Sequence, residues 1–161
     1  ALKSVSIYSN VSVIPEQAFG NCTSLEKINI PSTVKSIGSY AFYNCSALTE
    51  LTLSKNITDI ANGAFYNCPN LTLYGYYDTV AESYAEQNNI PFVHLDKKVI
   101  SGDVNFDGKI DINDVTLLQR YIAGESVLTD DAVKAADFNK DRIIDIIDAT
   151  AIQTFIAHGQ N

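Results

Sequence analysis

The 161-residue chain contains no methionine and no tryptophan, and its 11 lysines and arginines are outnumbered by 19 aspartates and glutamates. The formal charge of −8 argues against nucleic acid or an anionic membrane as the main partner, because both require a basic surface. No apolar run approaches the roughly 18 to 20 residues of a membrane-spanning helix, so membrane insertion is not expected. The N-terminal stretch ALKSVSIYSN also lacks the charged and apolar regions of a signal peptide.

Motifs for catalysis and for zinc are missing as well. The cysteines Cys22, Cys45 and Cys68 recur at equal intervals, without the C-x₂-C spacing of a zinc or redox site. We therefore predict a buried ladder of free cysteines, since a free thiol behaves as a small hydrophobe. Neither His94 nor His158 has Cys, Asp or Glu at a spacing that suggests zinc or a catalytic triad. No serine lies in a G-x-S-x-G motif, and the sequence predicts a chain that is not an enzyme.

The first half of the chain repeats itself at the interval that separates these cysteines. The strings AFGNCTSLEKINIP, AFYNCSALTELTLS and AFYNCPNLTLYGY align without a gap up to the last. Leucines at L-x-x-L-x-L spacing within a period of about 20 to 29 residues are typical of a leucine-rich-repeat solenoid, with short strands and small helical turns. The positions that recur in register are Ile14, Ile37 and Ile60; Phe19, Phe42 and Phe65; and Leu25, Leu48 and Leu71.

Stacked coils of this kind form a continuous core that no single repeat could make. The register predicts that Leu25, Ile28 and Ile30 stack under Leu48, Leu51 and Leu53, whereas Lys27, Asn29, Glu50 and Thr52 face outward.

The two ends of the repeat region differ. A short helix around 80–87 and a last strand at 91–95 are predicted to cap its C-terminal end. At the other end Leu2, Val5 and Ile7 already occupy repeat positions, so we expect the natural protein to continue upstream.

The AF-x-NC-xx-L pattern over residues 1–95 resembles the BspA-like subclass of leucine-rich repeats. The resemblance implies a secreted or cell-surface protein that binds an unknown protein or surface ligand, without a shared active site.

The second half contains two acidic stretches, DVNFDGKIDIND from Asp103 and DFNKDRIIDIID from Asp137. Ca²⁺ takes six to eight oxygen ligands, and a 12-residue EF-hand loop supplies them from positions 1, 3, 5, 7, 9 and 12. The spacing therefore predicts two calcium ions. The predicted ligands are Asp103, Asn105, Asp107, the Lys109 carbonyl, Asp111 and Asp114 in loop one, and Asp137, Asn139, Asp141, the Ile143 carbonyl, Asp145 and Asp148 in loop two.

The sixth loop position must turn sharply, and it differs between the loops. Gly108 suits a positive φ, but Arg142 adopts one at a cost of about 1 kcal/mol, so loop two is predicted to be the weaker site. Ile110 and Ile144 at the eighth position are the apolar residues expected to pair the loops back to back.

A helix is predicted after each loop, whereas the segment LDKKVIS before loop one has no helical pattern. The stretch VTLLQRYIAG has apolar Val115, Leu118 and Ile122, and ATAIQTFIAHG has Ala149, Ile152 and Ile156 at the corresponding places. Missing entering helices and missing methionines count against a calcium sensor that exposes a groove.

Loop followed by helix, duplicated, with aspartate at position 12, resembles the dockerin family over residues 102–158. The resemblance implies a small all-α module of duplicated F-hands that docks on a cohesin domain of a scaffoldin, outside the cell. By the same resemblance, the contact residues are Ile112, Asn113, Leu117, Gln119, Arg120 and Gly124 in repeat one, and Ile146, Ile147, Gln153, Thr154 and His158 in repeat two.

The repeat also relates the two helices by a pseudo-twofold axis that allows two docking orientations. Because Asn113 faces Ile147 and Arg120 faces Thr154, the two orientations present different groups, and we expect one to dominate.

The sequence thus predicts a solenoid at 1–96, a linker at 97–101 and a dockerin at 102–161. Two functions follow from this organisation. One is a non-catalytic cellulosome component, and the other is the C-terminal part of a cellulosomal enzyme, a glycoside hydrolase or peptidase, whose catalytic domain lies upstream.

Overall fold

The computed structural model describes residues 2–159, so residues 1, 160 and 161 of the predicted domains lie outside the described part. The chain divides into two compact units, Ala1–Asp96 and Lys97–Asn161, and each is described here by itself. None of the helices in the described part has the length and apolar composition needed to cross a bilayer.

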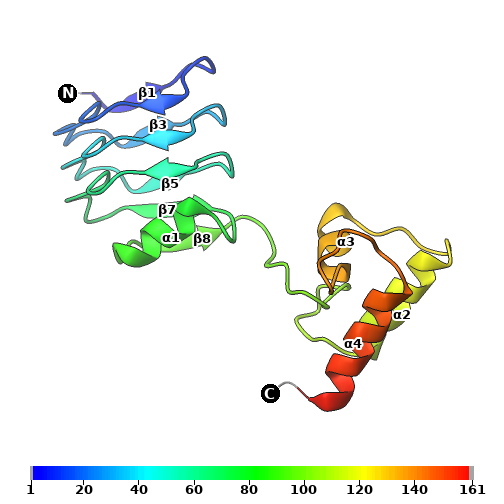
Figure 1. The fold of residues 1–161 in the computed structure, drawn as a ribbon. Helices are drawn as coiled ribbons and strands as arrows, with labels where there is room; N and C mark the ends of the chain where they lie inside the picture. The colour runs from blue at the N-terminus through cyan, green and yellow to red at the C-terminus, as the bar shows by residue number, and fades with distance from the viewer. Residues whose placement is uncertain (1, 160–161) are drawn as a thin grey trace. The chain divides into compact units, whose positions relative to one another are not determined.

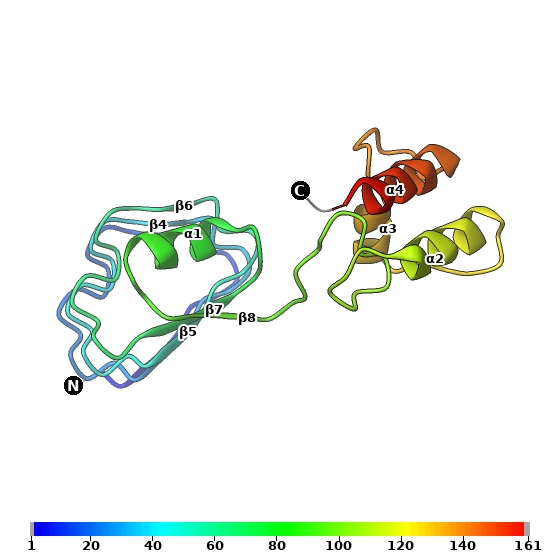
Figure 2. The ribbon, with the colours of Figure 1, turned by 90° about the horizontal axis from the view of Figure 1, so that it is seen from below.

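The first unit is a solenoid whose short parallel strands stack from coil to coil (Figure 1). Strand β1 pairs with β3 in a register that places Val5 beside Ile28, and β2, β4 and β6 form a second sheet on the opposite wall (Figure 2). The strands are β1 Ser4–Ser6, β2 Val13–Ile14, β3 Lys27–Asn29, β4 Ser36–Ile37, β5 Glu50–Thr52, β6 Asp59–Ile60, β7 Thr72–Gly75 and β8 Phe92–His94.

The connections between these strands are hydrogen-bonded turns, and the small helical turns predicted from the sequence are wrong for residues 2–79. In the first coil the N–H of Gly20 donates to the Gln17 carbonyl and that of Cys22 to the Phe19 carbonyl. Gln17 and Asn21 have φ values of 55° and 62°, in the left-handed region, which interrupts a right-handed helix. The chain therefore turns corners here without winding into a helix.

The core of the solenoid confirms the predicted register. Phe19, Phe42 and Phe65 stack with ring centroids 5.2 Å apart at both steps. The predicted apolar stack is buried, whereas the residues predicted to face outward are exposed. The buried members are Leu25, Ile28, Ile30, Leu48, Leu51 and Leu53, and the exposed ones are Lys27, Asn29, Glu50 and Thr52.

The cysteines are free, as predicted, and they line up inside the coil. Cys45 is buried and Cys22 and Cys68 are half-buried, and the thiols of Cys45 and Cys68 each donate to a backbone carbonyl of an earlier coil. Hydrogen bonding with the Cys68 thiol and burial together raise the pKa of Cys45 above its usual range. A thiol that stays protonated is a packing group and not a nucleophile.

The predicted cap is present as helix α1, Val80–Gln87, followed by β8. The Thr79 side chain accepts from the N–H of Glu82 and so caps the helix N-terminus. Tyr84 lies edge-on to Phe65, the last ring of the phenylalanine stack, with 5.8 Å between centroids. Burial raises the pKa of Tyr84, consistent with a ring that closes the core.

The second unit is built from α2 Ile112–Ile122, α3 Asp130–Ala136 and α4 Ile146–His158, with α2 packed against α4. Its core is formed by Val104, Val115, Leu118, Ala132, Ala136, Ala149 and Ile152. Ile110 and Ile144 pack against this core, but neither lies in a strand, so their direct pairing stays a prediction. Ile122, which we placed on the apolar stripe of its helix, is exposed.

Helix α3 was not predicted, and it ends where loop two begins. Our interpretation that both loops lack a preceding helix is therefore wrong for loop two, although residues 97–111 before and in loop one contain no helix. Thr129 caps α3 by accepting from the N–H of Ala132, and Asp130 and Asp131 lie in its first turn. The helix is too short to display a helical repeat in the sequence, which explains the omission.

The phenylalanine stack generates a test of the solenoid core. Phe42→Ala should destabilise the solenoid by about 3 to 5 kcal/mol, because it leaves a cavity between two aromatic neighbours. Hydrogen exchange of the whole chain would show faster exchange in β3 to β7. Tyr8→Ala, at a side chain that is 82% exposed, is the matched control and should change little. Unchanged exchange in β3 to β7 of Phe42→Ala would contradict the predicted role of the phenylalanine stack in the core.

Candidate calcium-binding loops and docking face

Loop one is held in its curve by side-chain oxygens that accept from its own backbone. The Asp103 carboxylate accepts from the N–H groups of Asp107 (3.1 Å) and Gly108 (3.0 Å). Asn105 Oδ1 accepts from the N–H of Asp107 at 2.8 Å, and Asp107 Oδ1 accepts from that of Lys109 at 2.9 Å. The predicted ligand side chains therefore bend the backbone around themselves, as a cation-binding loop requires.

The last predicted ligand of loop one joins the two ends of the loop. Asp114 is buried, and its two oxygens accept from the N–H of Asn105 (3.0 Å) and of Asp111 (2.9 Å). The Asp111 side chain in turn accepts from the N–H of Asn113, and Asp111 and Asp114 form a capping box at the start of α2. Loop closure and helix initiation thus depend on the same two carboxylates.

Loop two repeats this network with its own ligand residues. The oxygens of buried Asp148 accept from the N–H of Asn139 (3.2 Å) and of Asp145 (3.1 Å), and Asp145 caps α4. Asp137 Oδ2 accepts from the N–H of Arg142 at 3.1 Å. The two loops differ in their other residues but share these hydrogen bonds. The loop conformation therefore depends on the residues at the predicted ligand positions.

The negative charge of these loops is not compensated by the protein. Asp103, Asp114 and Asp148 are the buried charged residues of the described chain, and no lysine or arginine in residues 2–159 pairs with them. Asp137 Oδ1 is buried and has no hydrogen-bond partner within the same residues. A buried carboxylate without a counter-charge costs several kcal/mol, so the residues present fit a site for a divalent cation.

In the described part of the chain, the acidic side chains of the loops do not by themselves form a metal cage. No three His, Cys, Asp or Glu side chains of that part converge to form a metal site. A hard cation such as Ca²⁺ also draws on amide and backbone oxygens and on water, and both loops carry asparagine at the third position.

The backbone at the sixth position behaves as predicted. Gly108 has a φ of 85°, and Arg142 has a φ of 70° in the equivalent place. Loop two therefore carries a strain of about 1 kcal/mol that loop one avoids. This is the physical basis for our expectation that loop two binds its ion more weakly.

Apart from Leu117 and from Gly124, which is exposed beyond the end of α2, the predicted docking residues lie along one exposed stripe on each helix. Ile112 and Gln119 are about two turns apart, and so are Asn113 and Arg120, which keeps each pair on a single helical face. On this face Arg120 Nε lies 3.9 Å from Glu125 Oε2. Leu117 is half-buried and packs against the core of the unit. The exposed members are Ile112, Asn113, Gln119 and Arg120 on α2, and Ile146, Ile147, Gln153, Thr154 and His158 on α4.

The exposed stripe of repeat two is more apolar than that of repeat one. Ile146 and Ile147 are each 57% exposed, although isoleucine is usually buried. Ile143, predicted only as a carbonyl ligand, exposes 60% of its side chain close by in the sequence. The signal for it was the pair of adjacent isoleucines on each side of Asp145, which the ligand pattern obscured. Three exposed isoleucines within five residues make this segment a candidate interaction surface.

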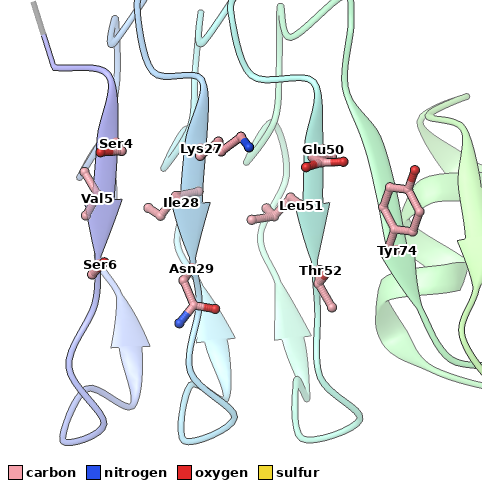
Figure 3. A pocket seen from close by; sticks show the side chains of 10 residues that line it. All are labelled: Ser4, Val5, Ser6, Lys27, Ile28, Asn29, Glu50, Leu51, Thr52 and Tyr74. Carbon is pink, nitrogen blue, oxygen red and sulfur yellow. The ribbon is translucent and has the colours of Figure 1, made fainter.

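The solenoid has a shallow groove of about 500 Å³ along the exposed face of β1, β3, β5 and β7 (Figure 3). Lys27 and Glu50 lie on neighbouring strands of this face, with Asn29 and Thr52 beside them. Charges of both signs are spread over the groove, so it does not by itself select one class of ligand.

Comparison with protein families gives two matches. A family model described as BspA type leucine rich repeat region matches residues 1–89 in six copies, and one described as dockerin type I domain matches residues 101–157. The first match covers more than half of the chain. Comparison with curated proteins and with solved structures gives no match.

The carboxylates that close the loops provide a test of the sites. Asp148→Asn keeps the side-chain shape but removes the charge and one acceptor oxygen. In a calcium titration, the variant should lose one of the two bound ions or bind it at least about tenfold more weakly. Asp131→Asn, in α3 outside the loops, is the control and should leave both affinities unchanged. If Asp148→Asn still binds two calcium ions with the affinities of the parent protein, loop two is not a calcium site.

Proposed function

Since the chain belongs to the BspA type leucine-rich-repeat proteins and continues into a dockerin type I domain, we propose that it is a non-catalytic cellulosome component that docks on a cohesin. The observation that carries this proposal is the pair of closed acidic loops, each leading into a helix with an exposed stripe. Neither matched family model describes a catalytic domain. The place of action is outside the cell, where cohesins are displayed.

Two calcium ions complete the docking module in this proposal. They would be held by Asp103, Asn105, Asp107, Lys109, Asp111 and Asp114, and by Asp137, Asn139, Asp141, Ile143, Asp145 and Asp148, with Lys109 and Ile143 contributing carbonyls. A bound ion supplies the positive charge that the buried carboxylates lack. The duplicated F-hand then orients α2 and α4 as a pair, although loop two is entered by α3 as well.

One orientation on the cohesin is favoured because the two exposed stripes differ. The stripe on α4 presents Ile146 and Ile147, whereas that on α2 presents Ile112 and Asn113 together with Arg120. A pseudo-twofold rotation of the pair would exchange an isoleucine for an asparagine and an arginine for a threonine. A difference of only about 1.4 kcal/mol between the orientations corresponds to a tenfold preference.

The solenoid supplies the second half of the function in this proposal. Dockerin and cohesin provide attachment, and the repeats provide an outward surface for a protein or surface ligand. Stacked repeats suit this role because each coil adds exposed positions at a fixed spacing without altering the core.

Calcium removal tests whether the ions are needed for folding. EDTA should unfold α2 and α4 because the buried carboxylates then repel one another without compensation. Each site contributes about 4 kcal/mol of stability at a calcium concentration about 1,000 times its dissociation constant. Hydrogen exchange of the whole chain would report the loss, while β1 to β8 and α1 should keep their protection. Full protection of α2 and α4 in EDTA would contradict the proposal.

Binding to a panel of cohesins tests the docking face. Ile147→Asp should weaken calcium-dependent binding by at least about tenfold, because it places a charge in an apolar contact. Val127→Asp is the matched control, since Val127 is 92% exposed but lies outside both stripes.

A test for a single docking orientation requires one further variant, in which Asn113 is exchanged with Ile147 and Arg120 with Thr154. Because a 180° rotation of the exchanged protein presents the parent's groups at these two pairs, it should bind the cohesin in the reversed orientation if these residues select the orientation. Cross-linking from one helix to the cohesin would detect the reversal. An unreversed orientation in the exchanged protein, together with a harmless Ile147→Asp, would show that the orientation is not fixed by these residues.

A further inference from the structure

Three tyrosines form an exposed aromatic cluster on the solenoid, away from the strand groove. Tyr40, Tyr43 and Tyr66 line a hollow of about 400 Å³ together with Gln17 and Asn21. Tyr40 is 45% exposed and Tyr66 is 64% exposed, although tyrosine normally buries much of its ring. We call Tyr40, Tyr43 and Tyr66 the tyrosine platform.

The rings of the platform are held in fixed relation to one another. Tyr43 and Tyr66 occupy equivalent positions in successive coils and stack with centroids 6.0 Å apart. Tyr40 lies edge-on to Tyr43, also at 6.0 Å. Rigid aromatic rings of this kind offer a large contact area at a small cost in conformational entropy.

The Tyr40 ring is placed by the repeated turn of the coil. Tyr40 has a φ of 54°, and the equivalent residues Gln17 and Gly63 have φ values of 55° and 70°, so this left-handed conformation belongs to the repeat. In the next coil the equivalent residue is Gly63, and a Cβ there would lie 2.7 Å from Cε1 of Tyr40. The Tyr40 ring therefore packs directly over Gly63, in space that a side chain at position 63 would fill.

The polar groups around the platform are neutral, and they both donate and accept. Asn67 Nδ2 donates to Asn44 Oδ1 (2.8 Å), and Asn44 Nδ2 donates to Asn21 Oδ1 (3.1 Å). This ladder leaves the Asn21 amide nitrogen without an acceptor among residues 2–159. The Gln17 amide and the tyrosine hydroxyls add further groups of the same kind. Among the described residues, no charged side chain lines the hollow, although the chain as a whole is acidic.

We propose that the tyrosine platform binds a neutral glycan, with sugar rings stacked on the tyrosine faces and sugar hydroxyls bonded to the amides. A pyranose ring has apolar C–H faces and hydroxyls that donate and accept, and so it complements flat rings edged by amides. A proline-rich peptide would also suit an aromatic surface, but it offers mainly carbonyl acceptors and leaves the acceptors of the platform unused. This inference rests on the proposed role of the repeats as the outward-facing binding module, and it names their ligand.

Native gels that contain a soluble neutral polysaccharide test the platform. The probes are hydroxyethyl cellulose, xyloglucan, galactomannan and dextran, and the protein is the whole chain. At least one probe should retard the parent protein. Tyr66→Ala and Tyr40→Asn should each weaken that binding by about tenfold. Asparagine readily adopts a positive φ, so Tyr40→Asn removes the ring without disturbing the turn.

Two controls separate the outcomes. Tyr8→Ala removes a tyrosine that is 82% exposed outside the platform, and it should bind like the parent. EDTA should leave glycan binding intact while abolishing cohesin binding, so a failure of docking and a failure of the platform are distinguishable. Absence of retardation with all four probes would overturn the proposal. Parental binding by both platform variants, or binding of a polyproline peptide in place of the polysaccharides, would overturn it as well.

Discussion

Hydrogen bonds from coil to coil are the interaction on which the repeat half depends. The N–H of Phe19 donates to the Ala41 carbonyl and that of Phe42 to the Ala64 carbonyl, each at 2.7 Å. These bonds lock successive coils at one offset, so that like residues fall on like residues. Stacked phenylalanines, aligned thiols, the amide ladder and the tyrosine platform are all consequences of that offset.

The second unit obtains its order from the hydrogen bonds of its two acidic loops. The backbone N–H groups of each loop donate to its aspartate side chains, and Asp114 and Asp148 are buried by the protein itself. The same carboxylates begin the helices that expose the isoleucine and arginine side chains. In the proposed function, ion binding and presentation of the docking face would therefore be coupled through a few side chains, whereas the solenoid distributes its stability over many coils.

The predictable parts of the structure are those where the pattern is long or chemically strict. The constant period of the first half was sufficient to place Phe42 in the core and Lys27 outside it, and the oxygen spacing located both loops. The turns between strands were mistaken for helical ones, because left-handed residues such as Gln17 and Asn21 leave little trace in hydrophobic periodicity. Helix α3 was too short to detect, and the exposure of Ile143 and of the tyrosine platform depends on neighbours that only the fold brings together.

The amide ladder has a direction. Each Asn side chain donates toward the preceding coil, from Asn67 to Asn44 to Asn21, so within residues 2–159 the row ends in an unused donor at one side and an unused acceptor oxygen at the other. Its dipoles add head to tail, as the peptide dipoles of a helix do. A linear polymer lying along the ladder would meet different chemistry at its two ends. The surface therefore has a polarity along the stacking axis of the coils.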